Sequence, residues 1–113
     1  MKRREVLAGI MLLAWSAAAN ASYMTYSQWA ALPLPGRSLY IAGAFDALVT
    51  ISRSSDDKYQ AHYNTCLVNA KMMNSQLAEN VSTFASTHPE LQSGGVVHAL
   101  LNYLIALCGV PPK

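Results

Sequence analysis

The side chains best suited to catalysis or metal binding in this 113-residue chain are three histidines, two cysteines and the neighbouring pair Asp56 and Asp57. No two of the histidines, His62, His88 and His98, stand three or four residues apart, as ligands on one helix face would. The chain has no Gly-x-Ser-x-Gly motif. Adjacent aspartates point in different directions and indicate a solvated loop. The sequence therefore predicts no enzyme, no metal site and no cofactor.

Cys66 and Cys108 are the only cysteines in the chain. An even cysteine count in an exported protein predicts a disulfide, which would stabilise the fold by about 4 kcal/mol for a loop of this length. Two free buried thiols are the alternative. No Cys-x-x-Cys is present, which argues against a redox role.

Residues 1–21 have the layout of a cleaved secretory signal peptide. Lys2, Arg3 and Arg4 precede an apolar run over residues 6–14, and Ala-Asn-Ala at 19–21 places small residues where a signal peptidase cuts. The run is too short to span a bilayer, which needs about 20 residues. We expect cleavage before Ser22 and a single domain over residues 22–113.

Removal of that segment changes the charge of the protein. The formal charge of +2 falls to zero, because three basic residues and one acidic residue are lost. A neutral domain has no basic field to hold nucleic acid or anionic lipid. We therefore expect no nucleic-acid partner, and no membrane association after cleavage.

The most apolar segment of that domain covers roughly residues 37–53. Plotted as a helix, more than half of its circumference is apolar, and Gly43, Asp46 and Thr50 form the remaining strip. Such a helix needs packing partners on at least two sides, so we expect it at the centre of a helical domain. Ser38 is its expected N-cap. Asp46 either faces water or contacts a partner protein.

Three further helices are expected around this central one. A short helix within residues 22–32, capped by Thr25 or Ser27, would end at a rigid corner formed by Pro33 and Pro35. A helix over residues 74–88, capped by Asn74, would place His88 near its last carbonyls. The apolar face of that helix holds Leu77, Ala78, Val81, Phe84 and Ala85.

The last helix is expected over residues 92–108 with Ser93 as its cap. Its apolar arc holds Val97, Leu100, Leu101, Leu104, Leu107 and Cys108. With the irregular apolar segment 66–73, these elements predict an all-α fold, a small four- to five-helix bundle with one intrachain disulfide. The polar segment 52–63 is either a solvated connector with a helical turn or a functional loop.

Several of these features follow one another in the order that is typical of a known protein family. A Tyr-x-x-Gly-x-x-Asp-Ala helix, here Tyr40, Gly43, Asp46 and Ala47, is followed by a first cysteine. A helix led by Gln-Leu at residues 76–77, a turn containing Pro89 and a final helix closing with a second cysteine come next. In these features the chain resembles the Rap/Tai family of type VI secretion immunity proteins.

The resemblance implies a helical, disulfide-bonded, homodimeric protein of the periplasm. Such a protein occludes the catalytic cleft of a secreted peptidoglycan amidase with a protruding loop. In this chain the candidate loop is 54–63, and the turn 88–93 is the second candidate. The expected contacts in the loop are Asp56, Asp57, Lys58, Tyr59 and His62.

Two other functions fit the same layout. An acid-stress chaperone of the HdeA type is also exported, helical and held by one disulfide, although this chain has few carboxylates to titrate. A purely structural periplasmic protein is the third interpretation.

Overall fold

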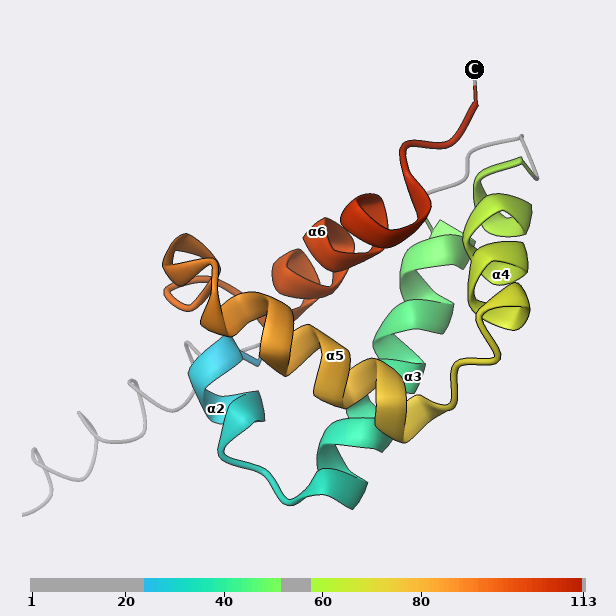
Figure 1. The fold of residues 1–113 in the computed structure, drawn as a ribbon. Helices are drawn as coiled ribbons and strands as arrows, with labels where there is room; N and C mark the ends of the chain where they lie inside the picture. Colours follow the sequence, from blue (N-terminus) through green and yellow to red (C-terminus); the bar gives the residue numbers. More distant parts are fainter. Residues whose placement is uncertain (1–23, 52–57, 113) are drawn as a thin grey trace, which may run out of the picture.

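The structure is a computed structural model that describes residues 24–51 and 58–112 (Figure 1). Over these residues the fold is all-α with no β-strand, which confirms the predicted small helical bundle. Five α-helices and one 3₁₀ turn follow one another. They are α2 (Tyr26–Ala30), α3 (Leu34–Ile51), α4 (Lys58–Asn69), α5 (Asn74–Ser86), η1 (Pro89–Leu91) and α6 (Val96–Cys108).

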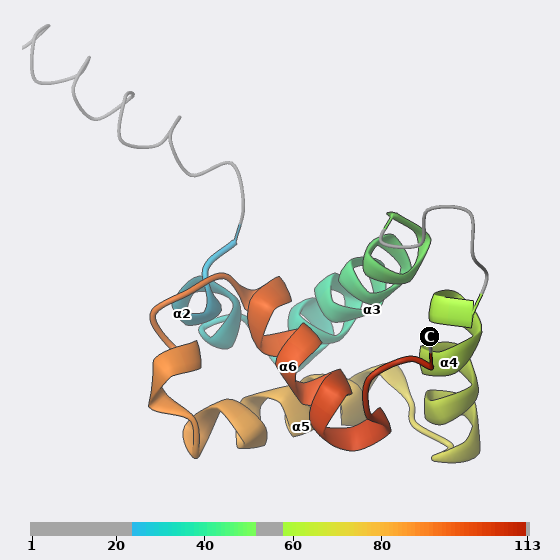
Figure 2. The ribbon, with the colours of Figure 1, turned by 90° about the horizontal axis from the view of Figure 1, so that it is seen from above.

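The longest helix, α3, is the element that the others pack against. Helices α4, α5 and α6 all contact it, and Figure 2 shows α5 and α6 crossing the molecule between α2 and α4. The buried face of α3 carries Ile41, Phe45 and Val49 at four-residue spacing. The prediction of a central helix is therefore confirmed.

Helices α4, α5 and α6 all contact α3, as expected for a helix that needs packing partners on at least two sides. Tyr40, Ala44 and Leu48 are half-buried and pack against the core. The expected polar or bare strip of Gly43, Asp46 and Thr50 is exposed. The apolar residues Leu39 and Ala47 are exposed beside that strip.

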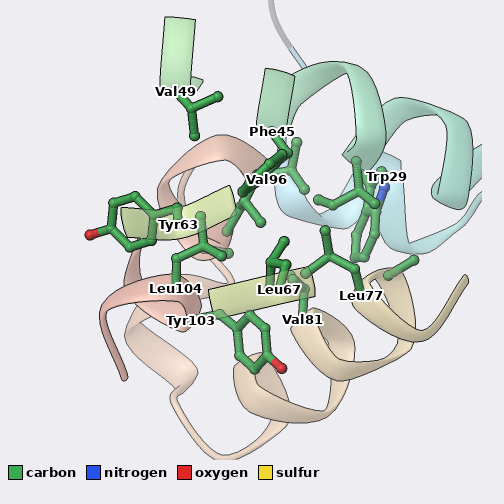
Figure 3. Packing of buried hydrophobic residues seen from close by; sticks show 14 of the residues in the cluster. Trp29, Phe45, Val49, Tyr63, Leu67, Leu77, Val81, Val96, Tyr103 and Leu104 are labelled. Carbon is green, nitrogen blue, oxygen red and sulfur yellow. The ribbon is translucent and has the colours of Figure 1, made fainter. Parts of the chain in front are cut away.

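The core is continuous from α2 to α4. Its largest fully buried side chains are Trp29, Ile41, Tyr63, Val81, Val96, Leu100 and Leu104. Figure 3 shows side chains from all five helices pointing into one interior, with Trp29 and Tyr63 near its opposite sides. Each such side chain contributes roughly 1.5–3 kcal/mol by leaving water.

The short helix α2 is fixed at its N-terminal end. Of the two predicted caps, Thr25 and Ser27, the N-cap is Thr25. Its Oγ1 accepts from the Gln28 backbone N–H while the Gln28 side chain accepts from the Thr25 N–H. The backbone of this segment also pairs with the loop before α6, where Tyr26 N donates to Gly94 O at 2.9 Å. The start of the described chain is thereby held against the start of its last helix.

Helix α3 begins three residues earlier than predicted. It starts at Leu34, so Pro35 lies within its first turn, where a proline removes no helical hydrogen bond. Ser38 is consequently not the N-cap, because its Oγ donates to Leu34 O at 2.7 Å from inside the helix. The predicted rigid corner is in part the first turn of α3.

The ends of α5 differ from the prediction by one or two residues. The N-cap position belongs to Met73 rather than Asn74, and the Gln76 Oε1 accepts from the Met73 N–H at 2.9 Å. The predicted core face is confirmed for Leu77, Ala78, Val81 and Ala85, with Phe84 half-buried.

The start and the buried arc of α6 also differ. The chain forms η1 first, and α6 begins at Val96 with Gly95, not Ser93, as its N-cap. Leu100 and Leu104 are buried as expected, but Val97 and Leu107 are exposed. The arc is rotated because Ala99 and Tyr103 face the core, and the Tyr103 hydroxyl accepts a hydrogen bond from Asn80 at 3.1 Å.

The predicted disulfide is present between Cys66 and Cys108. It joins α4 to the last residue of α6, with 5.8 Å between the two Cα atoms, and no described cysteine is free. The bond thus ties the end of the chain to the helix that follows the polar segment.

Candidate binding surface

An open apolar groove runs along the uncovered arc of α3. It has a volume of about 530 Å³. It is lined by Leu39, Tyr40, Gly43, Ala44, Ala47 and Leu48 of α3 and by Val97 of α6. We call this surface the α3 groove. None of its lining residues is charged, and Leu39 at its edge is 75% exposed. An exposed apolar hollow of this kind is a candidate site of binding or association.

Gly43 lies in the middle of the α3 groove. A Cβ atom at this position would have no neighbouring atom within 4 Å, so the fold of the described chain does not require glycine here. Glycine inside a helix costs roughly 1 kcal/mol relative to alanine. Neither a positive φ nor a close contact explains Gly43, in contrast to Gly109, whose φ is +78°.

The four residues of the sequence motif lie on the outer side of α3. Tyr40, Gly43 and Ala47 line the α3 groove, while Asp46 is exposed beside it. Of the four, only Tyr40 packs against the core, and it is half-buried. The groove itself was not predicted from the sequence. The signal for it was the presence of small residues one turn apart in a helix that is apolar around most of its circumference.

Asp46 lines a second hollow, which lies between α3, α4 and α5 and has a volume of about 490 Å³. Two apolar side chains at this hollow are strongly exposed, Val68 by 73% and Met73 by 68%. Lys71 also lines it and has a φ of 52° in the turn that ends α4. Exposed apolar side chains surrounded by polar and charged ones are typical of protein interfaces.

The predicted recognition loop is helical over much of its length. Lys58 is the first residue of α4 and is exposed, Tyr59 lies in the same first turn, and Tyr63 is buried in the core. Asp56 and Asp57 lie outside the described residues. Residues 58–63 thus form the start of α4, with the Tyr63 ring in the interior.

His62 is directed toward the end of the chain. Its Nε2 atom lies 3.0 Å from the Gly109 carbonyl oxygen, and its ring packs edge-on against Tyr63 at 5.0 Å between centroids. The side chain is half-buried. A shallow hollow beside it is lined by Lys58, Ala61, Thr65 and Pro112. The start of α4 and the C-terminal segment thus form one surface, at the end of the molecule marked C in Figure 1.

The second candidate turn, 88–93, is held by its own contacts. His88 stacks on Phe84 at 4.0 Å between ring centroids, and its Nδ1 lies 2.7 Å from the Phe84 carbonyl oxygen. This confirms the expected position of His88 at the last carbonyls of α5. Gln92 Nε2 also donates to Ala85 O at 2.8 Å. The turn is a rigid projection rather than a loose loop.

Within the described ranges, no group of three or more potential ligands gathers where a metal ion would bind. His62 stands one helical turn before Cys66, but that sulfur is engaged in the disulfide. None of the described helices combines the length and the apolar character needed to cross a bilayer. Comparison with known proteins gave no match: no family model, no curated protein and no solved structure is significantly similar to this chain.

Proposed function

We propose that this chain is a periplasmic immunity protein that binds a peptidoglycan amidase effector of type VI secretion and occludes its catalytic cleft. The observation that carries the proposal is the location of the family motif. Tyr40, Gly43, Asp46 and Ala47 lie at the surface of α3 or in its open groove. Gly43, Asp46 and Ala47 are exposed and add nothing to the interior of the chain, and recognition of another protein surface would give these three residues a role.

The architecture is consistent with this role. A disulfide between α4 and α6 and a core shared by five helices make a rigid scaffold, so little ordering is needed on binding. Rigid projections on such a scaffold, among them the start of α4 and the turn 88–93, are the type of element that enters a cleft. The exposed Lys58 and the half-buried His62 belong to the first of these projections.

The proposal includes the export of the chain with removal of residues 1–21, a segment outside the described residues. It also includes a homodimer as the working form.

The decisive experiment uses an amidase encoded next to this gene, with purified peptidoglycan as its substrate. We expect stoichiometric addition of the immunity protein to abolish hydrolysis. A variant with Asp57, Tyr59 and His62 replaced by alanine should lose at least about tenfold in affinity, as hot-spot side chains do. A matched control replaces three exposed residues of α5, Glu79, Thr83 and Ser86, by alanine. Full inhibition by the loop variant would refute the loop assignment.

Absence of any amidase binding by the unmodified protein would refute the function itself. In that case the acid-stress chaperone is the next hypothesis to measure. Suppression of client aggregation near pH 2 would support it, and failure at that pH would leave a structural role.

A further inference from the structure

We propose that the second hollow, between α3, α4 and α5, is a docking site for a segment of the amidase that presents a bulky apolar side chain flanked by one basic and one acidic residue. We call this surface the α4 hollow. The basic residue of the segment meets Asp46, and the acidic residue meets Lys71. The inference rests on the proposed function and deepens it, because it gives the partner a contact distinct from the start of α4.

The inner lining of the α4 hollow is apolar and rigid. Phe45, Leu67 and Leu77 line it, and each comes from a different helix. All three are buried members of the core, where Figure 3 shows them. The volume of about 490 Å³ lies within the range of roughly 300–1,000 Å³ that is typical of preformed binding sites. A bulky apolar side chain can therefore enter the hollow without rearrangement of the fold.

Two further apolar side chains extend this lining into solvent. Val68 in the last turn of α4 is 73% exposed, and Met73 at the start of α5 is 68% exposed. Methionine adapts its shape to a partner, because its side chain is unbranched and flexible. Contact of these two residues with a partner would remove apolar surface from water. An apolar group is thus the occupant that this part of the hollow favours.

Charge specifies what flanks the apolar side chain. Asp46 and Lys71 are the only charged residues that line the α4 hollow, and both are exposed. Neither forms an ion pair or a side-chain hydrogen bond with another residue of the described ranges. A partner segment with one basic and one acidic residue complements this pair, whereas two like charges would meet repulsion from one of them. Asn64 and Asn74 also line the hollow and offer amide groups to the backbone of the segment.

The backbone at Lys71 would suit glycine better than lysine. Its φ of 52° is left-handed, and no other described residue except glycine has a positive φ. Lys71 N donates to Val68 O at 3.0 Å and Met72 N donates to Leu67 O at 3.1 Å, which is the helix-ending pattern in which glycine is most common. A side chain in this conformation lowers the stability of the fold. A contact between the ammonium group and a carboxylate of the partner would give lysine a role here.

The first test removes each charge separately. The affinity of the amidase for the full chain is measured by isothermal titration calorimetry, beside inhibition of peptidoglycan hydrolysis. Asp46→Asn and Lys71→Gln should each weaken binding at least about fivefold, because a close charge pair across the interface is lost. Glu79→Gln is the matched control, since Glu79 is exposed on α5 and does not line the hollow. It should bind the amidase as tightly as the unmodified protein.

Lys71→Gly separates binding from folding. Glycine adopts the left-handed conformation without strain, so this variant should unfold at a higher temperature than the unmodified protein. It should nevertheless bind the amidase at least about fivefold more weakly, because the ammonium group is lost. A more stable variant that binds less tightly cannot owe its weaker binding to unfolding. Unchanged affinity of Lys71→Gly overturns the role of Lys71.

Cross-linking tests the chemistry of the occupant directly. A carbodiimide joins an amine to a carboxylate that contacts it, without a spacer. In the complex, mass spectrometry should find Lys71 joined to an aspartate or glutamate of the amidase. Lys71→Arg is the control, because it keeps the charge and hence inhibition but cannot form this amide bond. Amidase that is joined to Lys58 and never to Lys71 overturns the assignment of the α4 hollow.

The remaining outcomes separate this inference from the proposed function. If the unmodified protein and the variants of Asp46 and Lys71 inhibit the amidase equally well, the docking site fails and the immunity function stands. If the unmodified protein binds no amidase, both fail. If Lys71 is joined to a second copy of this chain and not to the amidase, the α4 hollow is a contact between copies and the proposal is overturned.

Discussion

Trp29 and Arg37 hold each other in place at the junction of α2 and α3. The indole Nε1 donates to the backbone carbonyl of Arg37 at 3.1 Å, and the guanidinium group lies over the same indole at 5.8 Å from the ring centroid. Arg37 then reaches beyond the tryptophan. Its Nε donates to Leu32 O at 3.0 Å and its Nη1 to the Ser82 hydroxyl at 3.2 Å, which connects the junction to α5.

This junction predicts a specific cost for small changes. Trp29→Phe keeps most of the buried area but removes the only hydrogen-bond donor of the indole, and we expect a loss of about 1–3 kcal/mol in the free energy of unfolding. Tyr26→Phe is the matched control. Its hydroxyl lies 3.5 Å from Ser82 O, so we expect a change within about 0.5 kcal/mol. Urea denaturation measures the free energy of unfolding of both variants. Equal losses in the two would contradict a stabilising hydrogen bond from the Trp29 indole.

Arg37 offers a second variant at the same junction. Arg37→Lys preserves the charge but cannot reproduce the donors to Leu32 and Ser82 at once, because lysine lacks the planar fork. We expect it to cost about 1–2 kcal/mol. Lys71→Arg at the exposed turn after α4 should be close to neutral. An unchanged unfolding midpoint for Arg37→Lys would mean that the positive charge at position 37, and not the hydrogen bonds of the guanidinium group, stabilises the junction.

The disulfide should contribute more than any single hydrogen bond. Cys66 and Cys108 are separated by 42 positions, and the chain-entropy relation gives about 4 kcal/mol for closing such a loop. We expect reduction, or paired replacement of both cysteines by alanine, to lower the free energy of unfolding by roughly that amount. Urea denaturation with and without reductant tests this. Two alkylatable thiols in the protein purified without reductant would contradict the bond itself.

The two glycines Gly43 and Gly109 should respond in opposite ways to alanine. Gly43→Ala meets no neighbour and should stabilise the isolated chain by roughly 1 kcal/mol, since alanine has the higher helix propensity. Gly109 caps α6 with φ +78° and ψ 174°, a region that other residues avoid, so Gly109→Ala should cost about 1–3 kcal/mol. Thermal unfolding at a concentration where the chain is monomeric separates the two effects. A destabilising Gly43→Ala under those conditions would reveal a contact within the chain.

The buried hydroxyl of Tyr103 should be coupled to Asn80. The Asn80 Nδ2 donates to it at 3.1 Å, and the hydroxyl also lies 3.9 Å from the Met72 sulfur. Tyr103→Phe should cost about 1 kcal/mol while its ring remains edge-on to Phe84. A double-mutant cycle with Asn80→Ala should return a coupling energy of about 0.5–1 kcal/mol. If the stability losses of the two single variants simply add, water replaces Asn80 as the hydrogen-bond partner of Tyr103 without a cost in stability.

Local patterns in the sequence were sufficient for some of these features. Thr25 was one of the two caps predicted for α2, because capping depends on residues within one turn. The core face of α5 followed from its own period. The pairing of Cys66 with Cys108 needed only an even count and an exported context. Each of these features depends on a few residues that are close in sequence or chemically unambiguous.

Other features depended on contacts that local patterns do not contain. Nothing in the period of α6 indicated that Tyr103 would face the core and Leu107 the solvent, because that choice depends on where α5 places Asn80. The polar segment ending at Tyr63 looked like a loop, yet its ring is buried and the segment is helical from Lys58. Burial in the tertiary structure outweighed the local polarity.

The sequence by itself determined that this protein is helical, has one nearly all-apolar helix and holds two cysteines that pair. Only the tertiary structure decided which side of α3 is covered. Helix period gives the apolar arcs but not the number of neighbours available to bury them. Ile41, Phe45 and Val49 face the other helices, whereas the apolar Leu39 and Ala47 remain exposed beside the expected bare strip, because no described helix packs over that part of α3.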